Sequence, residues 1–169
     1  MDKQAIAAEI PHLLRYARAL VRDPVLAQDL VQDSLERALG RWHLFVPRGR
    51  SLRSWLFTIL HNVHNNSVRD SKRKLDQRTP EVFEEDRHGV SPGTENPLLL
   101  RELKCGLDQL ADDQRAVVLL VGLEGMSYRE ASRILGVPVG TIMSRLARGR
   151  KHLRHLMDFS EQQVLRRVK

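Results

Sequence analysis

The sequence GMSYREASRILGVPVGTIMSRLARGR, residues 125–150, has the pattern of two short helices joined by a tight turn. Ser127 and Glu130 stand at the spacing of a capping box, so the first helix is expected to start at Ser127. Gly136 can adopt the backbone conformation of the turn, and Pro138 suits the first turn of a second helix. The stretch therefore predicts a helix-turn-helix, a motif whose second helix can lie in the major groove of DNA.

Each of the two helices of this motif is expected to have one face buried in the protein and one face exposed on its surface. Ala131 is small enough for a close helix crossing, while Ile142 and Leu146 are expected to face inward. Thr141 can cap the body of the second helix. The residues expected on its outer surface are Ser144, Arg145, Arg148 and Lys151. An ordinary helical hairpin with a basic solvated face is the alternative, but the agreement of turn, caps and charge favours DNA binding.

The composition favours a basic helical protein that contacts nucleic acid. The chain has 169 residues, enough for two small domains or one medium domain, and an aromatic content of 5% suits helices packed with aliphatic residues. The net charge of +7 is concentrated in two blocks. Residues 41–79 hold nine basic and two acidic residues, residues 138–169 hold eight and two, and residues 80–97 between them are acidic. Two separate basic blocks predict two contacts with a polyanion.

Cysteine usage and hydropathy indicate a cytoplasmic protein. Cys105 is the only cysteine, so no intrachain disulfide can form and a reducing compartment is expected. Because Cys105 lies between Leu103 and Leu107, we expect it to be a buried small apolar residue. The N-terminus lacks the pattern of a signal peptide. The longest apolar run, 117–123, is too short to span a bilayer, so no membrane insertion is expected.

The N-terminal part of the chain shows the periodicity of three helices. The first is expected over 3–22, the second from Pro24 to about Trp42, and the third, capped by Ser51, over 51–73. The apolar residues on one face of the first helix are Ile6, Ile10, Leu13, Leu14, Ala17, Leu20 and Val21. The second helix is expected to bury Leu26, Leu30, Leu35, Ala38 and Leu39. The third carries the apolar stripe Leu52, Trp55, Leu56, Ile59, Leu60 and Val63.

Residues 76–97 lose this periodicity. Proline, glycine and acidic residues punctuate the segment, which is typical of an extended linker. Helical periodicity resumes at Leu99 and continues into the helix-turn-helix, and no β-alternation of any length occurs. We therefore expect an all-α protein with two small helical domains, residues 1–75 and 98–160, joined by that linker and followed by a basic tail, residues 161–169.

A polar face on the second helix is the first candidate interaction surface. Its residues are spaced i, i+3, i+4 and i+7 and are Asp29, Gln32, Asp33 and Glu36. Such a face can dock a basic partner helix. A solvated polar face would show the same spacing, so the pattern alone leaves both interpretations open.

The polar face of the third helix is the second candidate. It comprises Thr58, His61, Asn62, Asn65, Asn66 and Arg69. Asparagine is a mediocre helix former, so several on one exposed face suggest a function, although a solvated face is the alternative. Amides can pair with base edges, and the basic residues over 69–74 can hold phosphates. Trp42 and Trp55 can stack on unpaired bases, but the place of Trp55 on the apolar stripe favours core packing.

Enzymatic and metal sites are not favoured. His61 and His64 are three residues apart on the third helix, as are His152 and His155, and such pairs can bind a metal. Neither pair has cysteine or carboxylate ligands nearby, so no metal is expected. The sequence also offers no convincing Ser/His/Asp set or phosphate loop. We therefore expect a binding protein without a cofactor rather than an enzyme.

Three stretches of the chain, in this order, resemble the extracytoplasmic-function (ECF) class of bacterial RNA polymerase sigma factors. They are DLVQDSLERAL at 29–39, SLRSWLFTILHNVHNN at 51–66 and MSYREASRILGVPVGTIMSRLARGR at 126–150. Each is moderately specific, and the resemblance covers nearly the whole chain. It implies a sigma factor that binds core RNA polymerase, directs initiation through −10 and −35 promoter elements, assists DNA melting and is controlled by an anti-sigma factor.

The resemblance also implies roles for the segments. Residues 1–75 are similar to the promoter-melting domain, and residues 98–160 to the domain that reads the −35 element. The polar face of the second helix falls where the family binds the clamp helices of the largest polymerase subunit. The loop 43–50 falls where an extruded base is captured. The acidic linker would pass through the polymerase channel near the RNA path.

The same resemblance implies two sets of DNA contacts. The set implied for the −10 element is Arg48, Arg50, His61, Asn62, Asn65, Asn66, Arg69 and Arg73. The set implied for the −35 element is Arg129, Thr141, Met143, Ser144, Arg145, Ala147, Arg148 and Lys151. Met143 departs from the family, whose members often carry Lys or Arg there. Since Met cannot make the bidentate hydrogen bonds by which Arg reads guanine, readout would depend more on Ser144, Arg148 and DNA shape.

Three other functions fit the sequence less well. A stand-alone helix-turn-helix regulator would explain residues 98–169 but not the polar faces of the second and third helices. A sigma-like decoy that titrates an anti-sigma factor would be expected to lose its basic DNA-facing residues, which here are abundant. A metal-dependent nuclease built on His61 and His64 lacks further ligands.

Overall fold

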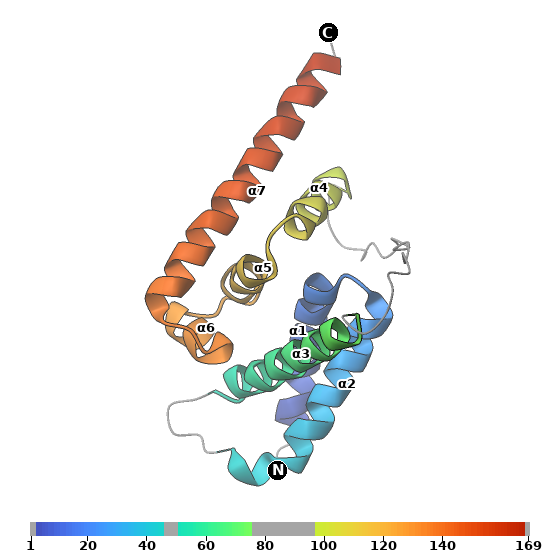
Figure 1. Cartoon of the computed structure of the whole chain (residues 1–169), viewed down its shortest axis with the longest axis vertical. Coiled ribbons are helices and arrows are strands. Elements are labelled where there is room, and N and C mark those ends of the chain that lie inside the picture. Colours follow the sequence, from blue (N-terminus) through green and yellow to red (C-terminus); the bar gives the residue numbers. More distant parts are fainter. Residues whose placement is uncertain (1–2, 46–50, 76–96, 168–169) are drawn as a thin grey trace. The chain divides into compact units, whose positions relative to one another are not determined.

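The computed structural model describes residues 3–45, 51–75 and 97–167, which contain helices and no strand (Figure 1). The elements are α1 (Lys3–Val21), α2 (Pro24–Gly40), the 3-10 turn η1 (Trp42–Leu44), α3 (Leu52–Leu75), α4 (Pro97–Asp108), α5 (Asp112–Val118), the π-helical turn η2 (Leu119–Leu123), α6 (Tyr128–Leu135) and α7 (Val139–Arg167). They form two compact units, an N-terminal unit of α1–α3 and a C-terminal unit of α4–α7. The predicted all-α class is confirmed. Among the helices of these ranges, none combines the length and apolarity needed to cross a bilayer.

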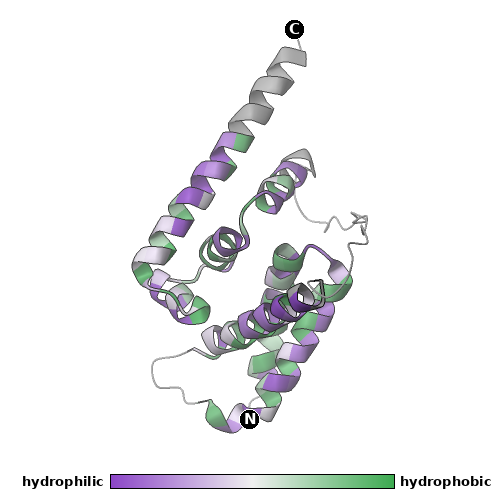
Figure 2. Cartoon of the chain, viewed as in Figure 1, coloured by the Kyte–Doolittle hydropathy of each residue, from purple (hydrophilic) through white to green (hydrophobic). Residues whose placement is uncertain are grey.

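The three helices of the N-terminal unit pack around one apolar core. Each is amphipathic, with hydrophobic and hydrophilic residues alternating along the ribbon (Figure 2). Tyr16 of α1 and Phe57 of α3 are fully buried and meet edge to face, with 5.2 Å between their ring centroids. Neither aromatic residue was among those predicted for the core. The rest of this core includes Ile6, Leu13, Ala17, Leu20, Leu30, Val31, Leu56, Leu60 and Val63.

The buried face of α2 is rotated from the predicted one. Leu26 and Leu39 were expected in the core but are 55% and 45% exposed, and Ile10 of α1 is also exposed. The residues that α2 buries are Ala27, Leu30, Val31, Ser34 and Ala38. Three of these five are small, which lets α2 approach its neighbours closely. The Ser34 hydroxyl donates to the Leu30 carbonyl at 2.6 Å, so its burial leaves no unsatisfied donor.

Helix starts in this unit follow the local sequence. The Asp23 carboxylate accepts hydrogen bonds from the amides of Val25 and Leu26 at 2.7 and 3.0 Å, and Pro24 occupies the first helical position of α2. The Ser51 hydroxyl accepts from the Ser54 amide at 3.1 Å at the start of α3. Both predicted starts are therefore confirmed.

The helix-turn-helix of the C-terminal unit is formed by α6 and α7. The predicted capping box is present: the Ser127 amide donates to the Glu130 carboxylate at 2.9 Å, and the Glu130 amide donates to the Ser127 hydroxyl at 3.3 Å. Ser127 is the cap, so the helix itself begins one residue later than expected. Gly136 ends α6 with φ +65, the left-handed conformation that the turn required. Ala131, Ile142 and Leu146 are buried, as predicted.

Two predictions for this unit were wrong, those for Thr141 and Cys105. Thr141 does not cap α7, because the Thr141 and Ile142 amides donate to the Pro138 carbonyl and the helix begins at Val139. The helix continues to Arg167, so residues 161–167 of the predicted basic tail extend α7. Cys105 is exposed instead of buried. Its neighbour Gly106 takes the buried position, where a side chain would meet Leu153 of α7.

The buried Arg115 joins α4 to α5. Its side chain is almost fully buried and donates to the backbone carbonyls of Leu107, Asp108 and Leu110 at 2.8, 3.2 and 2.8 Å. A fourth bond, of 3.3 Å, reaches the Asp112 carboxylate. The carbonyls at the end of a helix have no intrahelical partner, so a buried guanidinium with several donors can satisfy them together.

Gly149 sets the distance between α7 and α5. A Cβ at this position would lie 2.6 Å from Cγ2 of Val118. We expect Gly149→Ala to destabilise the C-terminal unit by about 1–3 kcal/mol through overpacking, although alanine normally stabilises a helix. Urea unfolding followed by circular dichroism measures this change.

Gly140 of the same helix supplies the matched control. A Cβ at Gly140 has nothing within 4 Å, so Gly140→Ala is expected to leave stability unchanged or slightly raised. Equal effects of the two substitutions would contradict the close approach of α7 to Val118.

Candidate functional site

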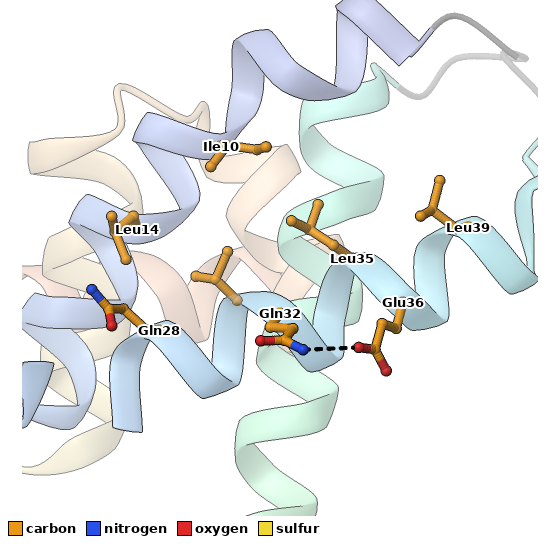
Figure 3. A pocket seen from close by; sticks show the side chains of 8 residues that line it. Ile10, Leu14, Gln28, Gln32, Leu35, Glu36 and Leu39 are labelled. Carbon is orange, nitrogen blue, oxygen red and sulfur yellow. Dashed lines mark hydrogen bonds between the residues drawn. The ribbon is translucent and has the colours of Figure 1, made fainter. Parts of the chain in front are cut away.

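The polar face predicted on α2 is exposed. Asp29, Gln32, Asp33 and Glu36 all lie on the surface, on the side of the helix away from its buried residues. The Gln32 amide donates to the Glu36 carboxylate at 3.1 Å (Figure 3). This pair orders the two side chains across one helical turn. The face is therefore available for a partner that supplies basic or hydrogen-bonding groups.

An apolar groove between α1 and α2 adjoins this face (Figure 3). It has a volume of about 300 Å³ and is lined by Ile10, Leu14, Gln28, Val31, Gln32, Leu35, Glu36 and Leu39. The groove was not predicted, because Ile10 and Leu39 were expected on the buried faces of their helices. The sequence does carry one indication of the groove, since α2 has more apolar residues than one buried face can hold. Gln32 and Glu36 belong to both the polar face and the groove, so the two surfaces are continuous.

The polar face predicted on the third helix, now α3, is called the asparagine face below, and it is largely exposed as predicted. Asn62, Asn66, Arg69 and Arg73 lie on the surface, and Asn65 is half-buried. Thr58 is half-buried and donates its hydroxyl to the Ser54 carbonyl at 2.8 Å, so that donor is already used. Arg48 and Arg50, which were also predicted to contact DNA, fall outside the described residues.

His61 differs from the other members of this face. It was expected opposite the apolar stripe, yet its ring is mostly buried, and within the described residues its Nδ1 has no hydrogen-bond partner. Burial, and secondarily the charge of His64, lowers the pKa of His61 from 6.5 to about 4. The imidazole is therefore neutral near pH 7 and cannot attract a phosphate by charge.

The depressed pKa of His61 predicts a pH-dependent stability. Between pH 6.5 and 4 the unfolded chain binds a proton that the folded chain does not, so stability present above pH 6.5 is lost as pH falls toward 4. We expect this loss to reach about 3 kcal/mol in the N-terminal unit. Urea unfolding at several pH values, compared with His61→Gln, measures it.

Direct titration provides the check on this prediction. An NMR titration should place the pKa of His61 near 4. A pKa near 6.5, or an unchanged pH dependence of stability in His61→Gln, would contradict the buried neutral state.

Three aromatic side chains gather where α2 leads toward α3. Ring centroids lie 5.4 Å apart for Trp42 and Phe45, 5.1 Å for Phe45 and Trp55, and 6.1 Å for the two tryptophans. All three are half-buried. Trp55 was expected in the core but belongs to this surface cluster. The cluster therefore joins the end of the η1 turn to the first turn of α3.

On α7, the outward residues occupy different environments. Met143, Ala147, Arg148 and Lys151 are exposed, as is Arg129 on α6. Ser144 is half-buried and donates to the Thr141 carbonyl at 3.0 Å. Arg145 was expected on the outer surface but is half-buried, because its Nε lies 2.9 Å from the Asp113 carboxylate at the start of α5. This ion pair holds α7 against α5.

Both units match known families. Residues 6–61 match the family described as "Sigma2 domain of PhyR", and residues 100–153 match "Sigma-70, region 4". The ECF RNA polymerase sigma factor EcfG of Rhodopseudomonas palustris (strain TIE-1) is 36% identical over 96% of this chain and 92% of its own length. The ECF RNA polymerase sigma factor SigC of Mycobacterium tuberculosis is 38% identical over 80% of this chain and 72% of its own length.

A solved structure is similar over nearly its full length. It is the sigma factor RpoE of Bartonella quintana in complex with the anti-sigma factor NepR. The two chains are 35% identical, with a TM-score of 0.82, over 92% of this chain and 96% of that one.

Proposed function

This chain belongs to the ECF family of RNA polymerase sigma factors, and we propose that three exposed helical faces carry its function. The polar face of α2 binds core RNA polymerase, the asparagine face of α3 binds the −10 element, and the outer face of α7 binds the −35 element. The observation that carries this proposal is that these faces are exposed on helices whose other sides form the cores. Residues 1–75 and 98–160 would then be the two functional domains, joined by the linker 76–97.

The α2 face suits the clamp helices of the largest polymerase subunit. Asp29, Asp33 and Glu36 supply three carboxylates on one side of a rigid helix, and Gln32 is held in place by its bond to Glu36. Basic residues on a partner helix complement such a face and raise the rate of encounter. The adjoining apolar groove adds area that can be desolvated on docking.

The α3 face suits single-stranded DNA. Asn62 and Asn66 are one helical turn apart and exposed, so both amides can reach bases that have left the duplex. Arg69 and Arg73 continue the face by further turns and can hold phosphates. Unstacked bases present edges that are hidden in the duplex, and their capture offsets the few kcal/mol per step that unstacking costs.

Asn66→Ala is expected to impair promoter opening more than promoter binding. The loss of one bidentate amide–base pair corresponds to about 1–3 kcal/mol, or roughly 5- to 150-fold fewer open complexes. Permanganate reactivity of unpaired thymines measures opening, and filter binding at low temperature measures the closed complex.

Ser67→Ala is the matched control for this prediction, since Ser67 is the next residue of α3 and is also exposed. Equal loss in both variants, or equal loss of open and closed complexes in Asn66→Ala, would contradict base capture by this face.

We also infer that an anti-sigma factor of the NepR type controls this chain. The support is the likeness to the Bartonella quintana sigma factor, which was solved with NepR. A partner that fills the α1–α2 groove also covers Gln32 and Glu36, which belong to the α2 face. Such a partner would exclude the polymerase by occupying the same surface. This function also implies that the chain acts in the cytoplasm, as a binding protein without catalytic activity of its own.

Size-exclusion chromatography with purified core RNA polymerase tests the function. Co-elution, together with transcription that depends on the chain, is the expected result. Binding to NepR without binding to polymerase would instead indicate a decoy that titrates the anti-sigma factor. Binding to duplex DNA without polymerase would indicate a stand-alone regulator.

A further inference from the structure

The recognition helix α7 has an exposed apolar side at its N-terminal end. Val139 is 36% exposed and Met143 is 54% exposed, and Ala147 is also on the surface. These residues are spaced i, i+4 and i+8, so they follow one another along one side of the helix. The buried residues Ile142 and Leu146 pack into the core of the unit. The exposed apolar side is therefore additional to the side that builds the fold.

The same side of α7 becomes basic toward the C-terminus. Arg150 and Arg154 lie seven and eleven residues after Met143, which is two and three helical turns on the same side, and both are exposed. Lys151 is exposed beside them. The first turns thus present apolar groups and the later turns present positive charges. A partner that presents an apolar group to the first turns of α7 and negative charges to the later turns complements this side of the helix.

Duplex DNA has this combination in its major groove. A helix-turn-helix directs the N-terminal residues of its recognition helix at base edges. The 5-methyl group of thymine is the apolar group that the major groove presents. Phosphates lie at the groove walls, where cationic side chains bind them.

Neither Arg145 nor Arg148 lies beside Met143 on the same side of α7, where an arginine could read guanine. Arg145, two residues after Met143, has its Nε 2.9 Å from the Asp113 carboxylate, which directs it toward α5. Arg148 lies five residues after Met143 and thus on a different side of α7. Within the second turn of α7, Met143 is exposed, whereas Ser144 and Arg145 are half-buried and Leu146 is buried. The side chain that this turn offers to a partner is therefore a thioether, which is flexible and polarisable.

We propose that Met143, supported by Val139, makes the chain specific for a thymine in its −35 element through contact with the 5-methyl group. This rests on the proposed function, in which α7 binds that element. Met143 then determines specificity for one base, while Arg148 and the basic residues that follow supply affinity.

Deoxyuridine provides the test, because its base, uracil, differs from thymine only in lacking the 5-methyl group. The −35 element is first selected from a randomised duplex by the chain bound to core RNA polymerase. Each thymine of the selected duplex is then replaced singly by deoxyuridine, and affinities are measured with the same complex. One replacement is expected to weaken binding by about fourfold, the value of one buried methyl group.

Two variants locate the effect. Met143→Ala should bind thymine and deoxyuridine duplexes equally, at the lower affinity. Arg148→Ala should weaken binding to both duplexes while keeping the ratio between them. Both positions are exposed, so neither change is expected to disturb the fold.

The outcomes separate the inference from the function on which it rests. Tight binding of the selected duplex with no effect of any deoxyuridine, or a selected element without thymine, overturns methyl readout and leaves −35 binding intact. Discrimination that persists in Met143→Ala overturns the assignment to Met143. Failure to select any duplex overturns the proposed function of α7 itself.

Discussion

Asp33→Arg is expected to abolish co-elution of this sigma factor with core RNA polymerase. Asp33 lies in the middle of the exposed α2 face, between Asp29 and Glu36, and it makes no contribution to the core. Reversing its charge removes an attraction to the basic partner and adds a repulsion at the same place. Like charges across an interface cost several kcal/mol, so association at micromolar concentrations should be lost.

A matched charge reversal distinguishes an effect of the α2 face from an effect of the net charge of the chain. Asp70→Arg changes the charge by the same amount on an exposed position of α3, and it should leave co-elution intact in the absence of DNA. Circular dichroism of Asp33→Arg should match that of the parent chain. Normal co-elution of Asp33→Arg would show that the polymerase does not dock on this face, whereas loss in both variants would assign the effect to overall charge.

Arg115→Met is expected to destabilise the C-terminal unit by about 3–5 kcal/mol. Arg115 is 3% exposed and donates to three backbone carbonyls at the junction of α4 and α5. Methionine keeps much of the volume but none of the donors, so the Asp108 and Leu110 carbonyls lose the Arg115 bonds, and Leu107 keeps only its bond from the Leu110 amide. Since a small unit has a total stability of only a few kcal/mol, the loss should leave it largely unfolded at 37 °C.

Two spectroscopic signals locate this loss in one unit. Both tryptophans, Trp42 and Trp55, belong to the N-terminal unit, so their fluorescence should report an unchanged transition in urea. Circular dichroism should show that the helices of the C-terminal unit unfold at lower urea. The control is Arg154→Met, an exposed arginine of α7, for which a change within about 0.5 kcal/mol is expected. An equally small effect of Arg115→Met would mean that water satisfies the three carbonyls.

The features that the sequence predicted well are local. The capping box of Ser127 and Glu130 and the turn at Gly136 depend on groups within a few residues of each other. The exposed face of Asp29, Gln32, Asp33 and Glu36 follows from helical spacing and from the poor fit of charges to a core. These features are specified by backbone geometry and short-range hydrogen bonds, which the sequence states directly.

The choice among several apolar faces was not predictable in the same way. On α2 the large residues Leu26 and Leu39 suggested one buried side, but small residues such as Ala27 and Ala38 form the actual contact. Small side chains allow helices to approach closely, and their value appears only when the neighbouring helices are in place. The same reason explains Gly106, which is buried against Leu153, while Cys105 beside it is exposed.

The sequence by itself determined the all-α class, the starts of α2 and α3, the helix-turn-helix and the family, because these depend on local spacing and on motifs in order. Only the tertiary structure decided the environments of His61 and Arg145. Burial lowers the pKa of His61. The guanidinium of Arg145 forms an ion pair with Asp113, which lies thirty-two residues earlier in the chain. Desolvation and ion pairing depend on which residues the fold brings together, and that distance in space is not encoded in their distance along the chain.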